Sequence, residues 1–213
     1  MREVRRKAVA VTVAVCVFGL SFGVVAGESG LSVAQASAMS LLVFAGASQF
    51  AAVGIAAAGN PAAAVVTGLL LNSRLAAFGV LAAPLVVGPW WRRLLGAQLV
   101  VDEPVALALE HDDTELARSA FWFTGILLFV SWNVVTVLGA AAGDVLGDPT
   151  RLGLDAAFPA VFVAVLAPRL RDGGARRVAL GGAAVALALT PVLPAGLPVL
   201  LAGAAVVLGD RRR

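Results

Sequence analysis

The sequence predicts an all-α fold, a polytopic helical membrane protein of about seven to eight hydrophobic segments, some of them short or broken. Hydrophobic residues make up 60% of the 213 residues and charged residues 14%, with a mean hydropathy of +0.94. Soluble domains are typically about 45–50% apolar and about 25% charged. The charged residues gather in short blocks between long apolar runs, as in multi-spanning membrane proteins. We treat residues 1–213 as a single integral membrane domain.

The apolar runs define the expected membrane segments. The first follows the basic stretch MREVRRK and resembles a secretory signal, but it is longer than a usual apolar region of about 7–15 residues, so we expect it to be retained. The weakest segment, 94–110, is expected to be a crossing or a deep hairpin. Some segments are shorter than the roughly 20 residues of a straight crossing, as in transporters with broken helices. The segments are 8–27, 31–58, 61–83, 94–110, 119–142, 154–168, 176–193 and 196–209.

Turn chemistry marks the segment boundaries. Asn60 is expected to cap a helix that has Pro61 at its first position. The motif from Trp90 to Arg93 combines aromatic and basic residues, which is typical of a membrane interface. Prolines between residues 191 and 198 mark a turn before the last segment.

Lysine and arginine predict the orientation of the chain. Basic residues gather at the N-terminus, in the loop 169–177 and at the C-terminus, so we expect all three to be cytoplasmic. The acidic loop 143–155 should lie outside. Both termini can be cytoplasmic only if the number of crossings is even, so either 94–110 crosses or one of the other runs is re-entrant; we favour a crossing or deep hairpin at 94–110.

Three glycines in the first segment, Gly19, Gly23 and Gly27, recur every four residues. On a helix they form a smooth stripe that allows close helix approach. The stripe predicts a contact either within this chain or with a separate subunit.

Four successive segments carry polar residues near their centres. These groups are costly at the bilayer midplane unless they face protein, water or cargo. Their similar depth predicts the lining of a shared polar site, with Phe44, Phe50 and Leu71 shaping an apolar part. The candidate substrate-binding residues are Ser48, Gln49, Asn72, Arg74 and Asn133.

Arg74 is the most costly of these residues, and its expected partner is Asp102 or Glu103. The pair is either a purely structural ion pair or part of a carboxylate-binding or proton-coupling site, with Asp102 or Glu103 carrying the proton. Pro104 disfavours an unbroken helix at this point. Broken helices free backbone groups that can bind the two ends of a zwitterion, and Gly46 offers a similar break.

Other function classes find little support in the sequence. The single Cys16 lies in an apolar run, and His111 lies in a charged loop, where solvation is expected rather than metal binding. We expect no nucleic-acid binding, because the cations cluster at segment ends. No catalytic or cofactor-binding motif is present, so we expect no catalytic residues, no metal, no cofactor and no enzyme activity.

Several stretches together resemble the AzlC-type family of branched-chain amino acid exporters, the large subunit of the two-component exporter also called LIV-E. The resemblance runs from Gly19 to about Asp172. One departure is that 75–78, Leu-Ala-Ala-Phe, replaces the family's His- or Tyr-rich stretch. The stretches are GLSVAQASAMSLLVFAGASQFAAVG, LLLNSRLAAFG, LVVDEPVALAL and LDAAFPAVFVAVLAPRLRD, and the joint pattern is Ser40, Gly46, Gln49, Asn72, Arg74, Asp102, Glu103 and Pro159.

The resemblance implies export of leucine, isoleucine, valine and, as a further candidate, methionine or toxic analogues. It also implies coupling to an ion gradient, with protons as the expected ion, and a small AzlD-type membrane subunit as partner. The expected location is the bacterial inner membrane, within the lipid bilayer. The alternatives are a passive channel and a non-transporting scaffold subunit. A loose similarity between residues 36–45 and 155–164 raises the idea of an inverted repeat.

Overall fold

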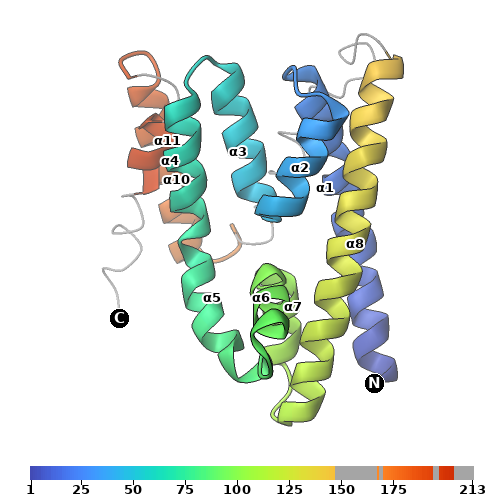
Figure 1. The fold of residues 1–213 in the computed structure, drawn as a ribbon. Helices are drawn as coiled ribbons and strands as arrows, with labels where there is room; N and C mark the ends of the chain where they lie inside the picture. The colour runs from blue at the N-terminus through green and yellow to red at the C-terminus, as the bar shows by residue number, and fades with distance from the viewer. Residues whose placement is uncertain (147–166, 168–169, 194–196, 204–213) are drawn as a thin grey trace. The chain divides into compact units, whose positions relative to one another are not determined.

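The computed structural model describes residues 1–146, 167, 170–193 and 197–203, and the described part is helical without strands. The predicted segment 154–168 therefore lies almost entirely outside the described residues, and so does most of the expected inverted repeat. The helices are α1 (Arg2–Glu28), α2 (Val33–Val43), α3 (Gly46–Ala57), α4 (Pro61–Asn72), α5 (Arg74–Ala82), a short 3₁₀ helix (Ala83–Leu85), α6 (Trp90–Gln98), α7 (Asp102–Leu109), α8 (Thr114–Leu146), α10 (Gly173–Leu189) and α11 (Leu197–Ala202) (Figure 1).

The chain forms two compact units, one comprising residues 1–49 and 71–147 and the other residues 50–70 and 148–213. In the described residues, three stretches are long and apolar enough to cross a membrane: Arg2–Glu28, Pro61–Leu85 and Thr114–Ala142. Together with the shorter apolar helices, they confirm the prediction of an all-α membrane protein.

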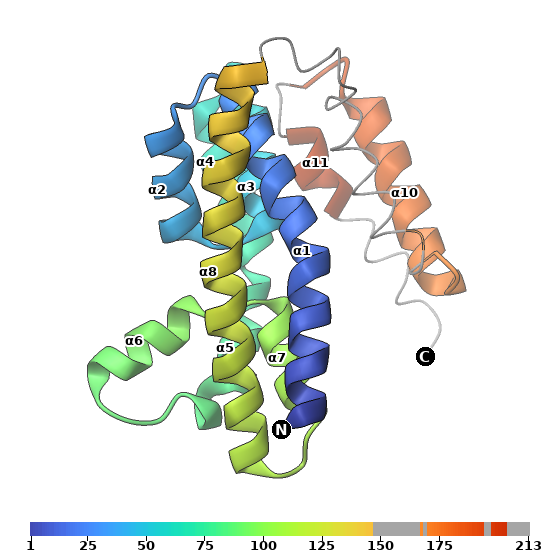
Figure 2. The same cartoon turned by 90° about the vertical axis from the view of Figure 1, so that its right-hand side faces the viewer.

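Helices α1 and α8 form the frame of the first unit and lie side by side in both views (Figures 1 and 2). They meet through small residues. A Cβ atom at Gly23 would overlap the backbone of Thr136 and lie 2.7 Å from the Ala140 nitrogen, so only glycine allows this approach. A Cβ atom at Gly139 of α8 would likewise overlap the Leu20 carbonyl oxygen and approach the Cα atom of Gly23. The glycine stripe therefore packs within the chain, and α1 is an integral part of the fold.

A buried apolar cluster closes one end of this unit. It joins Val4 and Ala8 of α1 to Leu107 of α7 and Ala120 of α8. Beside it, the Lys7 ammonium donates to the Glu110 carboxylate at 2.8 Å. The charged ends of α1 and α7 are thus tied together where both helices meet α8.

The predicted segment 31–58 is divided into two helices, and the second begins at Gly46, where the sequence offered a break. Helix α2 starts with a capping box, in which Ser32 and Gln35 satisfy each other's backbone N–H groups. It ends at Phe44, whose φ of 33° is left-handed. That conformation ends the α-helical hydrogen-bond pattern, and a new helix, α3, begins at Gly46.

The predicted segments 61–83 and 94–110 are also interrupted. A single-residue turn at Ser73, whose backbone dihedral angles stay α-helical, separates α4 from α5. Residues 99–101 separate α6 from α7, and neither helix is long enough to cross a membrane alone. A single crossing helix at 94–110 is therefore wrong, and the structure has two short helices joined by a turn there. Pro104 explains the break, because a proline is tolerated only in the first turn of a helix.

The second unit contains most of α3 and α4 together with α10 and α11. Asn60 caps α4 by accepting from the Ala63 N–H at 3.0 Å, and Pro61 is the first helical residue, which confirms the predicted boundary. Ile55, Ala63 and Ala64 form a small buried cluster. Helix α10 is capped by Asp172, which accepts from the Ala175 N–H at 2.7 Å.

Candidate functional site: three helix breaks

The first break, between α2 and α3, is tightly packed. The ring of Phe44 contacts Phe129 of α8 edge-on, with ring centroids 4.9 Å apart. A Cβ atom at Gly46 would lie 3.0 Å from the indole of Trp132, so glycine lets α8 approach the start of α3. A non-glycine residue with left-handed φ costs conformational energy. The surrounding rings hold Phe44 in this conformation and so fix the break.

Ser48 and Gln49 lie in the first turns of α3 and are buried. The Ser48 hydroxyl donates to the Ala45 carbonyl at 2.8 Å. Gln49 is 0% exposed, and neither its amide oxygen nor its amide nitrogen has a hydrogen-bond partner among the described residues. A buried amide without partners costs about 1–3 kcal/mol. Such a group is expected where a polar ligand binds.

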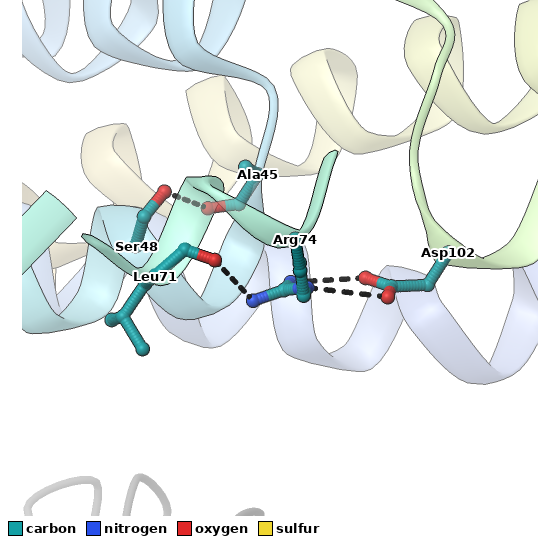
Figure 3. A network of polar contacts seen from close by, with 5 residues as sticks. All are labelled: Ala45, Ser48, Leu71, Arg74 and Asp102. Atoms are coloured by element: carbon teal, nitrogen blue, oxygen red, sulfur yellow. Dashed lines mark hydrogen bonds and ion pairs between the residues drawn. The ribbon is translucent and has the colours of Figure 1, made fainter. Parts of the chain in front are cut away.

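The second and third breaks are joined by an ion pair (Figure 3). The Arg74 guanidinium, at the start of α5, donates to both carboxylate oxygens of Asp102, at 3.3 Å from Nε and 3.0 Å from Nη2. Its Nη1 donates to the Leu71 carbonyl at 3.0 Å. The expected pairing of Arg74 with Asp102 is confirmed, and the two-point geometry fixes the orientation of the guanidinium.

Asp102 and Glu103 occupy the first turn of α7. Negative side chains are favourable there, because they interact with the positive end of the helix dipole. Asp102 and Glu103 are both half-buried, and Asp102 is the one that bonds Arg74. The third break thus places two neighbouring carboxyl groups beside one cation.

The middle of α8 supplies a further group of polar atoms. Asn133 donates from its amide nitrogen to the Phe129 carbonyl at 2.8 Å, while its amide oxygen is buried without a partner in the described part of the chain. The indole nitrogen of Trp132 is buried and unpaired in the same sense. Thr136 accepts from Ser40 at 3.4 Å and donates to the Gly19 carbonyl at 3.5 Å. These bonds link α8 to α1 and α2.

The predicted site residues are only partly connected. Arg74 and Asp102 bond directly, whereas Ser48 and Asn133 each bond within their own stretch of chain. The amide oxygen of Asn72 is also buried without a partner among the described residues.

Sequence reasoning missed two polar links. Besides the Ser40–Thr136 bond, Gln98 of α6 donates to the Leu41 carbonyl of α2 at 2.8 Å. The sequence did hold a signal for the Thr136 bonds, because Thr136 is a polar residue in an apolar helix, one turn from Trp132 and Asn133.

The groups at the breaks offer charges and hydrogen-bonding atoms. Within the described ranges, no group of three or more histidine, cysteine or acidic residues could hold a metal ion. The side chains offer a guanidinium, two carboxyl groups, amides and a hydroxyl. Helix ends add backbone donors and acceptors. These groups can bind a small polar solute and can carry a proton.

The comparison with protein families agrees with the helical architecture. The chain matches the family described as AzlC protein over residues 10–146. This match includes all three breaks and ends before the resemblance expected through about Asp172. No curated protein and no solved structure matches the chain significantly. Because the match covers more than half of the sequence, the chain belongs to the AzlC family.

Proposed function

We propose that this chain is the large subunit of a two-component secondary transporter that exports leucine, isoleucine and valine, and related side chains such as methionine. The AzlC family and the apolar helices support a membrane transport role. The observation that carries the finer proposal is Gln49, which is fully buried beside a broken helix and whose two amide atoms have no partner among the described residues. A side chain placed this way is suited to an occupant that supplies both a donor and an acceptor.

The break at Phe44 suits a zwitterion. Helix α2 ends there and presents carbonyl oxygens, which attract an ammonium group, while α3 begins at Gly46 and presents N–H groups, which attract a carboxylate. Half-helices that meet at such a break bind the charged ends of substrates in several transporters. Ser48 and Gln49 add polar contacts, and Phe44 offers an apolar surface for an aliphatic side chain.

The ion pair supports coupling to protons. Arg74 is held by Asp102, and Glu103 lies next to it in the first turn of α7. A proton on Asp102 would remove the charge that holds Arg74 and free the guanidinium for the substrate carboxylate. In this proposal, Asn72 and Asn133 complete the polar lining, and Asp102 or Glu103 carries the proton.

The proposal includes a partner and an orientation. Apolar residues of α4, α5 and α8, such as Leu69, Val80 and Val130, are exposed and suit contact with lipid or with a small AzlD-type subunit. The basic residues near both termini favour a cytoplasmic location for both ends. The bacterial inner membrane is the proposed location.

The test is an efflux assay in cells that express this chain with and without a small AzlD-type subunit. Cells are loaded with labelled leucine, and net efflux against a leucine gradient is followed before and after an ionophore collapses the proton gradient. We expect uphill efflux only with both subunits and only while the proton gradient exists.

Two results would redirect the proposal. Efflux that runs only downhill and ignores the ionophore indicates a passive channel. Absence of leucine movement with a well-expressed pair of subunits indicates a scaffold role. Labelled alanine and lysine serve as matched solutes, and equal efflux of all three would contradict selectivity for branched side chains.

A further inference from the structure

A groove of about 290 Å³ lies between the start of α6 and the first turns of α8. It is separate from the three breaks and plays no part in the proposed transport. Arg92 lines one wall, and Arg118, Ser119 and Trp122 line the other. All these residues belong to the first unit.

Arg92 and Arg118 are each held in place by neighbouring groups that do not use all of their N–H donors. The Arg92 guanidinium lies over the Trp122 ring, 5.3 Å from its centroid, an arrangement that leaves its N–H edge free to bind an anion. Arg118 bonds the Glu115 carboxylate and, at 3.4 Å, the Pro84 carbonyl. The Nε of Arg118 is buried and has no acceptor among the described residues.

The residues that line the groove have a net positive charge, because they include two arginines and one carboxylate. Glu115 is the acidic lining residue, and Arg118 neutralises it. Asp113 caps α8 by accepting from the Leu116 N–H at 2.7 Å and does not line the groove. Arg5 of α1 adds a further cation, 5.6 Å from the ring of Phe123, which also lines the groove.

The polarity of the groove changes along α8. Arg118 and Ser119 lie near the start of the helix, whereas Trp122 and Ile126 follow deeper along it. From Arg118 to Ile126 the helix rises about 12 Å. A phospholipid has the same order, with a charged headgroup followed by an apolar chain.

Helix α6 has the character of an interfacial helix. It extends sideways from the pair of α1 and α8 (Figure 2), and its side chains Trp90, Trp91, Leu94 and Leu95 are exposed. Tryptophan and arginine together are typical of the membrane–water interface. This composition suits a helix at the depth of phospholipid headgroups.

We infer that this groove binds the phosphate headgroup of an anionic phospholipid. The guanidinium groups of Arg92 and Arg118 donate to the phosphate oxygens, Ser119 adds a hydroxyl, and one acyl chain lies along Ile126. Bound in this way, the lipid fills the groove between α6 and α8.

The test uses the full chain purified in mild detergent and native mass spectrometry with phosphatidylglycerol or phosphatidylcholine of identical acyl chains. We expect the wild type to retain one phosphatidylglycerol and no comparable phosphatidylcholine. Arg92→Gln should weaken that binding about fivefold, the effect of one cation near an anionic lipid surface. Arg93→Gln is the matched control, because it removes the same charge from an exposed neighbour outside the groove.

Arg118→Gln should also weaken binding, but Arg118 contacts Pro84, so this variant can perturb the fold. Arg92→Gln leaves that contact in place and therefore decides the test. Three results would overturn the inference: equal retention of the two lipids, an equal loss with Arg93→Gln, or displacement of phosphatidylglycerol by millimolar inorganic phosphate. The last result would assign the groove to a free anion.

Discussion

Helices α1 and α8 run unbroken for 27 and 33 residues, whereas the chain between them is divided into short helices at Phe44, Ser73 and residues 99–101. The long pair is held by small residues in close backbone contact. The divided segments carry the ion pair, the Gln49 amide and the Asn72 amide oxygen, which are buried without partners among the described residues; α8 adds the Asn133 amide oxygen in the same state. Helices α1 and α8 therefore form a frame, in which the backbone groups bond within each helix. The divided segments form a site, in which backbone and side-chain groups remain available to bind a solute.

This comparison explains why polar residues are tolerated at the breaks. A continuous helix in lipid satisfies its own backbone, and polar side chains add only cost. A broken helix already exposes backbone donors and acceptors, so polar side chains and a polar solute can complete them. The frame should therefore respond to volume changes, and the breaks should respond to changes in polarity.

The largest expected effect is in the frame. Gly23→Ala should destabilise the protein by about 1–3 kcal/mol, because the new methyl group overlaps backbone atoms of α8 that cannot move aside independently. Thermal unfolding in detergent and membrane abundance measure the effect. Gly27→Ala is the matched control, since its Cβ would meet only the Ala140 carbonyl at 3.7 Å. Equal stability of the two variants would contradict close packing at Gly23.

At the first break the expected effect has the opposite sign on stability. Gln49→Leu should raise stability, by up to about 1–3 kcal/mol, because it removes a buried amide that lacks partners, and it should abolish leucine efflux. Thr124→Val is the control, since Thr124 is also buried with its hydroxyl unpaired in the described part of the chain but lies outside the breaks. It should keep efflux. Loss of stability in Gln49→Leu would show that the amide is satisfied in the native membrane.

The smallest expected effect concerns the tie between Lys7 and Glu110. The hydrogen bond from Lys7 lowers the pKa of Glu110 below its ordinary value of 4.5. A lowered folded-state pKa stabilises the protein above the unfolded-state value, and this contribution is lost as the pH falls through the lowered pKa. Stability should therefore decrease slightly below about pH 4.5, and Glu110→Gln should reduce that slope. An unchanged slope would show that the tie does not form in solution.

Much of the frame could be predicted from the sequence, because each feature has a local signal. The four-residue spacing of Gly19 and Gly23 indicated close helix packing, and Asn60-Pro61 marked a helix start. The pairing of Arg74 with Asp102 followed from the cost of an isolated charge in a membrane. These features depend on residue types that have few alternatives in lipid.

The breaks were less predictable. Nothing in the sequence at Phe44 marks a left-handed residue, because that conformation is imposed by packing against Phe129 rather than by local preference. The bond from Gln98 to the Leu41 carbonyl joins residues 57 positions apart and leaves no pattern in the sequence. Pro104 and Gly46 were the two residues whose types predicted a break.

The central claim is that the breaks form the transport site rather than a structural core, and the ion pair tests it most directly. Arg74→Ala and Asp102→Ala each leave an uncompensated charge, which costs about 3–5 kcal/mol in a buried pair and less where the pair is partly exposed, as here. Each single variant should lower membrane abundance and efflux.

The decisive measurement is membrane abundance together with leucine efflux per molecule in the double variant Arg74→Ala, Asp102→Ala. The account predicts that abundance returns toward wild type, because no unpaired charge remains, while efflux stays lost, because the groups that bind substrate and carry the proton are gone. Recovery of both abundance and efflux would show that the pair is only structural and would contradict the account.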